Sequence, residues 1–274
     1  MSQMFDLGGK TAVITGGAGF LGRQHADAIL SFGGTAVLLD RSRAAMRSAL
    51  QQLSCRHPER VVGHIVDITD ERAVARAAAS IARRHGGVHV LINNAANDPK
   101  VGPGNALTNA SRLEHFPLSA WDDDLAVGLT GAFLCCKHFG PRIVASGGGS
   151  IINISSDLGV IAPDQRLYAR PGLPRSRQSV KPVTYSVVKT GLVGLTRYLA
   201  TYWADQGVRC NALCPGGFRN RQPAAFLKRV ARLVPMGRMA EPGELQGAIV
   251  FLASDASSYM NGSVISIDGG RSCW

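Results

Sequence analysis

The chain of 274 residues contains no apolar run as long as the roughly 18 residues that a membrane span requires. Its beginning, MSQMFDLGGK, lacks the basic segment followed by an apolar segment that marks a secretory signal peptide. The six cysteines do not show the paired CxxC spacing of a zinc site. We therefore expect reduced, mostly buried thiols, no metal centre, no membrane association and a cytoplasmic location.

Acidic residues are scarce relative to basic ones, with 19 Asp and Glu against 30 Lys and Arg and a formal net charge of +11. Such an excess is compatible with binding to nucleic acid or to a smaller anion. The sequence has no basic stripe interleaved with aromatic residues. We therefore expect a small-molecule ligand and no nucleic acid, and salt-dependent retention on DNA would indicate the opposite.

The most informative stretch is TAVITGGAGFLG, which begins at Thr11. An apolar, β-branched run predicts a buried strand over residues 11–15. Gly16, Gly19 and Gly22 follow before a helical pattern begins. A strand, a Gly-rich turn and a helix in this order are typical of dinucleotide binding, because the glycines let the backbone approach the diphosphate at the positive end of the helix. A Gly-rich turn without a ligand is the alternative.

Asp40 ends a second predicted strand, TAVLLD, roughly 20 residues after the glycines. A carboxylate at this position accepts hydrogen bonds from the adenosine ribose hydroxyls and repels a 2′-phosphate. Arg41 and Arg43 favour the opposite preference, because either side chain could pair with that phosphate. We predict NAD as the cofactor, with NADP as the second choice, because the strand fixes Asp40 whereas arginine side chains can swing away.

Strand-like and helical segments alternate along the chain. This alternation predicts an α/β protein with a Rossmann-type, doubly wound parallel sheet of about seven strands and helices on both faces. We expect a single domain over residues 1–274, since no internal repeat or linker interrupts the pattern. Strands are expected over 11–15, 35–40, 61–68, 88–93, 150–154, 208–214 and 263–268. Helices are expected over 23–32, 42–53, 70–85, 183–205, 222–233 and 242–253. A further helix of about 25 residues is expected to begin at an N-cap Ser119 and to be kinked or broken near Pro141.

In such a sheet, ligands bind at the carboxyl ends of the strands, where Asp40, Asp67, Asn93, Ser155 and Pro215 are expected. This placement makes the strand ends the first candidate for a functional site.

Tyr185 and Lys189 are four residues apart and therefore share one face of a predicted helix. A neighbouring ammonium group favours the ionised phenol, so Tyr185 could exchange a proton with an alcohol or a carbonyl. Ser155 could hydrogen-bond the oxygen on which charge develops. An ordinary amphipathic helix explains a single Tyr-x-x-x-Lys equally well. The Gly-rich turn, Asp40 and the strand-end serine together favour the catalytic interpretation.

With these motifs, the chain resembles the short-chain dehydrogenase/reductase family over essentially its whole length. The matching segments are FDLGGKTAVITGG, Asp40, VDI at Asp67, NNAA at Asn93, INISS at Ser155, the Tyr185 and Lys189 pair, NALCPGG at Asn211 and SVISIDGG near the C-terminus. The resemblance implies an NAD(P)-dependent oxidoreductase that interconverts an alcohol and a carbonyl. Tyr185 would be the acid/base, Ser155 would hold the substrate oxygen, and Lys189 would lower the tyrosine pKa and bind the nicotinamide ribose.

The resemblance also implies that Asp67 reaches the adenine and that the Pro215 segment flanks the nicotinamide. It further implies a homo-oligomer, a tetramer or a dimer, that pairs the 119–146 and 183–205 helices across subunits. The catalytic residues are thus expected to be Ser155, Tyr185 and Lys189. The cofactor is expected to contact Gly16, Gly19, Phe20, Leu21, Gly22, Asp40, Arg41, Asp67, Ile68, Asn94, Ala95, Ala96, Tyr185, Lys189, Pro215, Gly216 and Phe218.

Two positions depart from the family's pattern. Phe20 stands where shorter single-domain members usually have a glycine, and the glycine spacing is closer to the nucleotide-sugar branch. Gly128, in LAVGLTGAF, replaces the asparagine that is thought to hold a proton-relaying water. The alternative is therefore a cofactor-binding protein, scaffold or regulator, with weak or no turnover. Hydride transfer with a matched substrate would distinguish the two.

A Pro- and Arg-rich insertion over residues 158–182 is the third departure. Both its ends lie close in sequence to the predicted catalytic residues, so we expect an ordered lid over the substrate. The stretch PGLPRSRQSVKP is similar to oxidoreductases of bacterial surface-sugar and flagellin-glycan pathways, and we expect a sugar-derived or other anionic substrate. Solvent exposure or a subunit contact is the alternative for the basic residues that suit such an anion, which are Arg166, Arg170, Arg175, Arg177 and Lys181.

Overall fold

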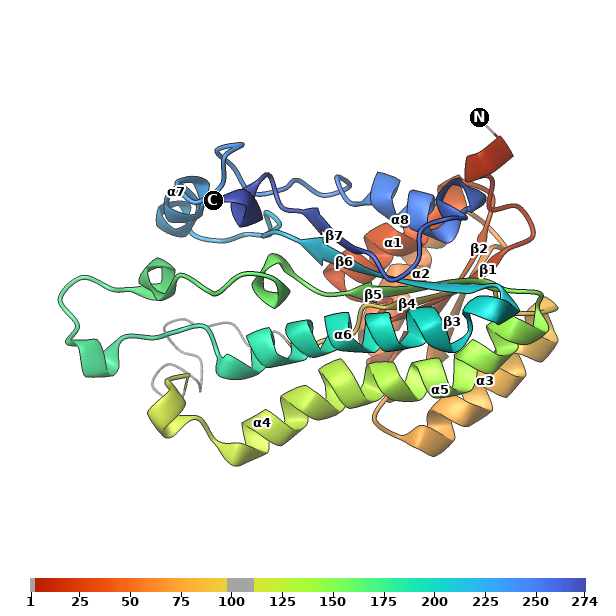
Figure 1. Cartoon of the computed structure of the whole chain (residues 1–274), viewed down its shortest axis with the longest axis horizontal. Helices are drawn as coiled ribbons and strands as arrows, with labels where there is room; N and C mark the ends of the chain where they lie inside the picture. Colours follow the sequence, from red (N-terminus) through yellow and green to blue (C-terminus); the bar gives the residue numbers. More distant parts are fainter. Residues whose placement is uncertain (1–2, 98–110) are drawn as a thin grey trace.

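The computed structural model describes residues 3–97 and 111–274. Residues 1–2 and 98–110 lie outside the described residues. The centre of the fold is a sheet of seven parallel strands in the order β3-β2-β1-β4-β5-β6-β7. Helices lie on both of its faces (Figure 1). The predicted Rossmann-type architecture is thus confirmed. No helix among the described residues is long and apolar enough to cross a membrane.

The central strands are buried on both faces, as the near-continuous apolar runs in the sequence require. In register, Ile14 lies opposite Leu38 on one side and Ile92 on the other. One strand is shorter than predicted because Asp67 accepts hydrogen bonds from Thr69 and turns the chain before the next helix. The strands are β1 Thr11–Thr15, β2 Thr35–Asp40, β3 Val61–Ile65, β4 Val90–Asn93, β5 Gly149–Ile154, β6 Val208–Pro215 and β7 Val264–Ile267.

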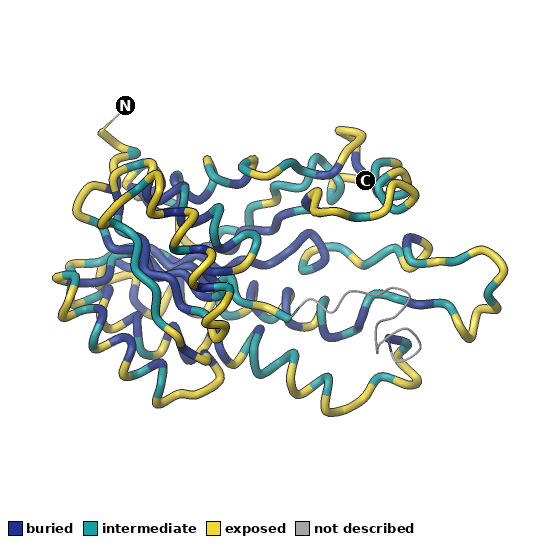
Figure 2. The backbone as a smooth tube through the Cα atoms, turned by 180° about the vertical axis from the view of Figure 1, so that it is seen from behind, coloured by how far each residue is buried: buried dark blue, intermediate teal, exposed yellow. Residues whose placement is uncertain are grey.

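The helices are α1 Phe20–Ser31, α2 Arg43–Ser54, α3 Glu71–His85, α4 Leu118–Leu125, α5 Gly131–Ala145, α6 Val183–Tyr202, α7 Ala224–Ala231 and α8 Gln246–Ala253. Helices α1, α2 and α8 cover the face to which Ile14 points, and α3, α5 and α6 cover the face to which Val13 points. Adjacent residues of a strand thus point to opposite faces of the sheet and pack in two separate hydrophobic cores. Figure 2 shows the buried strands between these helical layers.

The long helix predicted from Ser119 differs from the structure in two ways. It begins at Leu118 behind Pro117, with no side-chain cap, and it is not broken at Pro141. The irregular segment is instead a π-helical turn, Ala126–Thr130, between α4 and α5. Helix α5 continues through the proline because tertiary packing, with Phe139 and Ile143 fully buried on either side, outweighs the local propensity.

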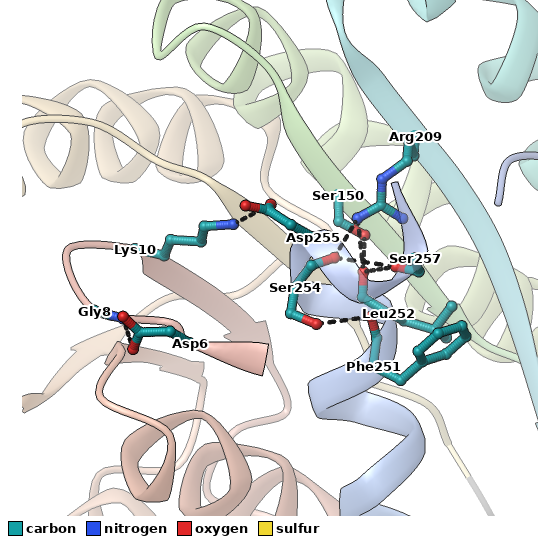
Figure 3. Close-up of polar contacts among 10 residues, drawn as sticks. All are labelled: Asp6, Gly8, Lys10, Ser150, Arg209, Phe251, Leu252, Ser254, Asp255 and Ser257. Carbon is teal, nitrogen blue, oxygen red and sulfur yellow. Dashed lines mark hydrogen bonds and ion pairs between the residues drawn. The ribbon is translucent and has the colours of Figure 1, made fainter. Parts of the chain in front are cut away.

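A polar cluster fixes the end of α8 near the amino ends of the strands (Figure 3). Arg209 Nη2 donates hydrogen bonds to the carbonyl oxygens of Leu252 and Ser254, each at 3.1 Å. Ser150 Oγ also donates to the Leu252 carbonyl, at 2.7 Å. A cation is favourable here because the last carbonyls of a helix lack partners within the helix. Ser150 and Arg209 are the second residues of β5 and β6, so the cluster lies at the opposite end of the sheet from the predicted site.

A small third core joins the insertion to α7. Leu167, from the short 3-10 helix Gln165–Tyr168, is buried with Val230 of α7. Tyr168 packs near Phe226, with ring centroids 6.1 Å apart. In Figure 1 the insertion and α7 extend together beyond the carboxyl ends of the strands. These two segments therefore form a wall that is packed separately from the sheet.

Candidate active site

A cavity of about 890 Å³ opens at the carboxyl ends of the strands. It lies where the strand order reverses between β1 and β4, which is where ligands bind in open α/β sheets. Of the residues predicted to be catalytic or to bind the cofactor, all but Gly22 line this cavity. The structure therefore brings the predicted residues together, while their individual roles stay predictions.

The Gly-rich turn is packed too tightly for side chains. Gly16 has a φ of +60°, which favours glycine. A Cβ atom on Gly22 would overlap the carbonyl oxygen of Gly16, so Gly22 lets α1 approach the turn from behind the cavity. Gly19 precedes α1, and no side chain caps the helix. The turn and the uncapped helix therefore fit a diphosphate group.

Two carboxylates line the cavity beside this turn. Asp40 accepts backbone hydrogen bonds from Ser42 at 2.9 Å and from Ala18 at 3.3 Å, which fix its side chain at the end of β2. Asp67 accepts from the backbone N–H of Thr69 at 2.9 Å and from its hydroxyl at 2.7 Å. These hydrogen bonds, with a smaller contribution from the charge of Arg41, hold the pKa of Asp67 below its usual range.

The floor of the cavity depends on Thr15, which the sequence reasoning missed as a functional position. Its Oγ1 accepts hydrogen bonds from the backbone N–H groups of Asn94 and Ala95, both at 3.0 Å. The Asn94 side chain donates back to the Thr15 carbonyl at 2.9 Å. The signal was a hydroxyl residue at the end of an otherwise apolar strand. These hydrogen bonds hold the loop after β4 against the Gly-rich turn.

Ser155 and Lys189 connect β5 to α6. Ser155 Oγ donates to the Lys189 carbonyl at 2.7 Å, and Lys189 Nζ donates to the Ile154 carbonyl at 2.8 Å. Tyr185 lies one helical turn before Lys189, whose Nζ is 5.8 Å from the centroid of the tyrosine ring. A second ammonium group, that of Lys181, lies 3.6 Å from the same centroid. Sequence reasoning placed Lys181 in the insertion and did not connect it with Tyr185.

The π-helical turn places Gly128 against α6. A Cβ atom on this buried glycine would lie 2.5 Å from Cγ1 of Val188, which stands between Tyr185 and Lys189. An asparagine could therefore replace the glycine only if Val188 moved. The helix is thus distorted at Gly128, and the surrounding space is filled by the valine side chain.

The insertion supplies two of its basic side chains to the cavity, Arg170 and Lys181. Arg166 is instead paired with Asp164 at 2.8 Å, with its side chain 88% exposed. Arg175 and Arg177 do not line the cavity either. Three further arginines do, and no sequence motif had connected them with the site: Arg221, Arg229 and Arg271.

Comparisons with known proteins agree with this geometry. A family model described as short chain dehydrogenase matches residues 10–169, and one described as Enoyl-(Acyl carrier protein) reductase matches residues 175–272. The chain is 32% identical to D-threitol dehydrogenase of Mycolicibacterium smegmatis, over 97% of this chain and 94% of that protein. It is 33% identical to galactitol 2-dehydrogenase (L-tagatose-forming) of Cereibacter sphaeroides, over 99% and 98%.

Solved structures give the same result. The crystal structure of a gluconate 5-dehydrogenase from Burkholderia cenocepacia, in complex with NADP and tartrate, superposes with a TM-score of 0.83 at 26% identity. The match covers 99% of this chain and 98% of that chain. A short-chain type dehydrogenase/reductase from Mycobacterium marinum gives a TM-score of 0.84 at 28% identity, over the whole of both chains.

Proposed function

We propose, since this chain belongs to the short-chain dehydrogenase/reductase family, that it oxidises a hydroxyl group of a polyol or sugar-derived acid to a carbonyl, and catalyses the reverse reduction. The observation that carries this proposal is the meeting of Ser155, Tyr185 and Lys189 in the cavity that also contains the Gly-rich turn. The polyol class is taken from relatives named for D-threitol, galactitol and gluconate. A cofactor-binding protein without turnover is not favoured by these relatives.

The family binds NAD(P), and the residues at the cavity fit such a cofactor. The Gly-rich turn and the start of α1 would hold the diphosphate, Asp40 the adenosine ribose, Asp67 and Ile68 the adenine, and Lys189 the nicotinamide ribose. When bound, the nicotinamide supplies the hydride acceptor or donor. We propose NAD as the preferred form, because backbone hydrogen bonds fix the Asp40 carboxylate whereas the Arg41 side chain is exposed.

Side chains of the protein would carry out the proton transfer. Tyr185, in its phenolate form, accepts the substrate hydroxyl proton at its oxygen during oxidation and returns it during reduction. The ammonium groups of Lys181 and Lys189 stabilise that negative charge. The Ser155 hydroxyl donates to the Lys189 carbonyl in this structure. If this hydroxyl rotates toward the cavity, it can instead donate to the substrate oxygen, on which negative charge develops as the proton leaves.

The proposed roles of the insertion and of subunit contacts follow from packing. Residues 158–182 would form a lid over the cavity, because Leu167 of this insertion packs with Val230 of α7. The chain as a whole, residues 1–274, would form a single domain. Exposed Tyr198 and Tyr202 on α6 would pair subunits in a homo-oligomer. A solution mass equal to the 29.0 kDa of one chain would contradict that pairing. A lid is expected to be cleaved by proteases at a different rate when ligands are bound. A slow rate of cleavage in the insertion that is the same with and without ligands would contradict this role.

The proposed activity is measured directly with a panel of polyols and sugar acids and both cofactors. The formation of reduced nicotinamide, followed by its absorbance, is the expected result with at least one substrate. Cofactor binding without turnover on the whole panel, in both reaction directions, would favour the scaffold alternative.

A further inference from the structure

We propose that Arg170, Arg229 and Arg271 form a carboxylate-binding subsite, and that the preferred substrate is a polyhydroxy acid of the aldonate class or its keto form. The three arginines come from the insertion, from α7 and from the turn after β7, and all three line the cavity. The inference rests on the proposed function, because it assigns a substrate class to the same site.

The wall of the cavity formed by the insertion, α7 and the C-terminal turn is strongly basic. Among the described lining residues, Asp157 is the one carboxylate near this wall, since Asp40 ends β2 and Asp67 lies in the turn after β3. The basic residues that line the cavity at this wall are Arg170, Lys181, Arg221, Arg229 and Arg271. This excess of positive charge favours an anionic ligand.

Asp157 is already engaged and does not neutralise the remaining arginines. Its Oδ2 accepts from Arg271 Nη1 at 2.8 Å, and the two side chains are 4% and 10% exposed. Its Oδ1 accepts from the Ser156 hydroxyl at 2.7 Å and from the backbone N–H of Leu158 at 2.8 Å. One edge of the Arg271 guanidinium is thus held, which orients the group at the cavity wall.

Arg229 carries the observation that points most directly to a ligand. Its Nε is buried and has no hydrogen-bond partner among the described residues. The next residue, Val230, is buried in the small core shared with Leu167, which holds this part of α7 in place. A buried donor without a partner is unfavourable, so a rotation of the side chain that brings this guanidinium group to an acceptor atom on a ligand would gain binding energy. The planar guanidinium group matches the two oxygens of a carboxylate.

The cofactor phosphates are the competing anions. The diphosphate is expected at the Gly-rich turn, and a 2′-phosphate would lie beside Asp40 and Arg41 at the end of β2. The wall with Arg229 is instead linked to the acid/base, because Lys181 lies over the Tyr185 ring. An anion at this wall therefore belongs to the reacting molecule.

The experiment compares D-gluconate with D-glucitol, and D-threonate with D-threitol. The members of each pair share a carbon chain and differ in a terminal carboxylate against a hydroxymethyl group. The variant is Arg229→Gln, since Arg229 forms no ion pair with any of the residues that the structure describes. The matched control is Lys228→Gln, because Lys228 is the preceding residue of α7, is exposed, and does not line the cavity. Both substitutions remove one positive charge.

The wild type is expected to have a higher kcat/KM for the acids than for the matched alditols. Arg229→Gln should raise KM for the acids by about tenfold or more, the size expected for a lost charge-assisted hydrogen bond. It should leave KM for the alditols and Kd for NAD within about twofold, and Lys228→Gln should leave all of these constants within that range.

A wild-type preference for the alditols would overturn the subsite while leaving the proposed function intact. Equal losses on acid and alditol, or an equal loss of NAD affinity, would also overturn it by assigning Arg229 to packing or to the cofactor. If no compound is turned over, the proposed function fails, and calorimetry with D-gluconate and the enzyme–NADH complex decides the subsite separately. Binding of D-gluconate to the wild-type complex that is weaker in the Arg229→Gln variant supports the subsite. Absence of D-gluconate binding to the wild-type complex contradicts the subsite.

Discussion

Lys181 Nζ lies 3.6 Å from the centroid of the Tyr185 ring, closer than Lys189 Nζ at 5.8 Å. The backbone N–H of Lys181 donates to the side chain of Gln165 at 2.8 Å, so the insertion itself positions this lysine. A cation over an aromatic ring is attracted to it, and the attraction increases when the phenol ionises. The insertion thus places a positive charge over Tyr185, the proposed acid/base, in addition to lining the cavity.

Lys181→Met should therefore move the pH profile of alcohol oxidation. Loss of the cation makes the phenolate less favourable, so the basic limb of kcat/KM shifts to higher pH, by about one unit or less. Lys181→Arg should keep the wild-type profile, and the exposed Lys228→Met serves as the control for a lost surface charge. An unchanged profile in Lys181→Met would assign Lys181 to packing.

We expect the preference for NAD over NADP to depend on Asp40. Two unit charges about 4 Å apart at an effective dielectric constant of 20 repel by roughly 4 kcal/mol, so we expect the wild type to bind NAD at least about tenfold more tightly than NADP. Asp40→Asn keeps an oxygen acceptor and removes the charge, and should narrow that ratio. Titration of both cofactors measures it, and equal or tighter NADP binding by the wild type would contradict the prediction.

Gly128→Asn should destabilise the protein by about 1–3 kcal/mol, because its Cβ would lie 2.5 Å from Val188 Cγ1. Adding Val188→Ala should recover much of that loss, and turnover of the double variant should equal or exceed that of the wild type. Chemical unfolding measures the first effect. Gly247→Asn is the control, since a Cβ on this exposed helical glycine would meet nothing within 4 Å. Equal destabilisation at both glycines would contradict the contact with Val188.

Stability should fall as the pH is lowered from about 6.5 to about 4, in part because of His25. This side chain is fully buried in α1, and burial lowers its pKa to about 4, with the neighbouring Asn94 opposing the shift only in part. The unfolded chain therefore binds more protons in that pH window, which removes up to about 3 kcal/mol of stability. Above the window the stabilising contribution is complete.

Urea unfolding of His25→Met across that window should show a shallower loss of stability than the wild type. Some dependence should remain, because burial also lowers the pKa of His64, His85 and His89. The exposed His115→Gln is the control and should keep the wild-type slope. Identical slopes for His25→Met and the wild type would contradict the assignment.

The parts of the site that could be predicted are those whose residues lie within short, continuous segments of the sequence. Gly16 directly follows one predicted strand and Asp40 ends the next, while Tyr185 and Lys189 share one helix. A parallel sheet therefore brings the two strand ends to one edge, which is where such a site is expected. Arg229 and Arg271 could not be predicted, because their position depends on how α7 and the C-terminal turn pack beyond the sheet. No periodicity encodes that packing.

The same distinction explains the error in the long helix. The local rule for proline predicted a break at Pro141, but burial of Phe139 and Ile143 keeps α5 intact. The irregular turn lies instead at Gly128, where α4 and α5 meet against Val188. Local propensity located the helix, and tertiary contacts decided where it deviates.

Tyr185→Phe is the most direct test of catalysis, because it removes the oxygen of the proposed acid/base and keeps the aromatic ring near Lys181 and Lys189. The measurement is the initial rate of NAD reduction with the best polyol or sugar acid, together with Kd for NAD. We predict a loss of at least about a hundredfold in rate with Kd unchanged within about twofold. Equal rates for Tyr185→Phe and the wild type would contradict the catalytic role of Tyr185.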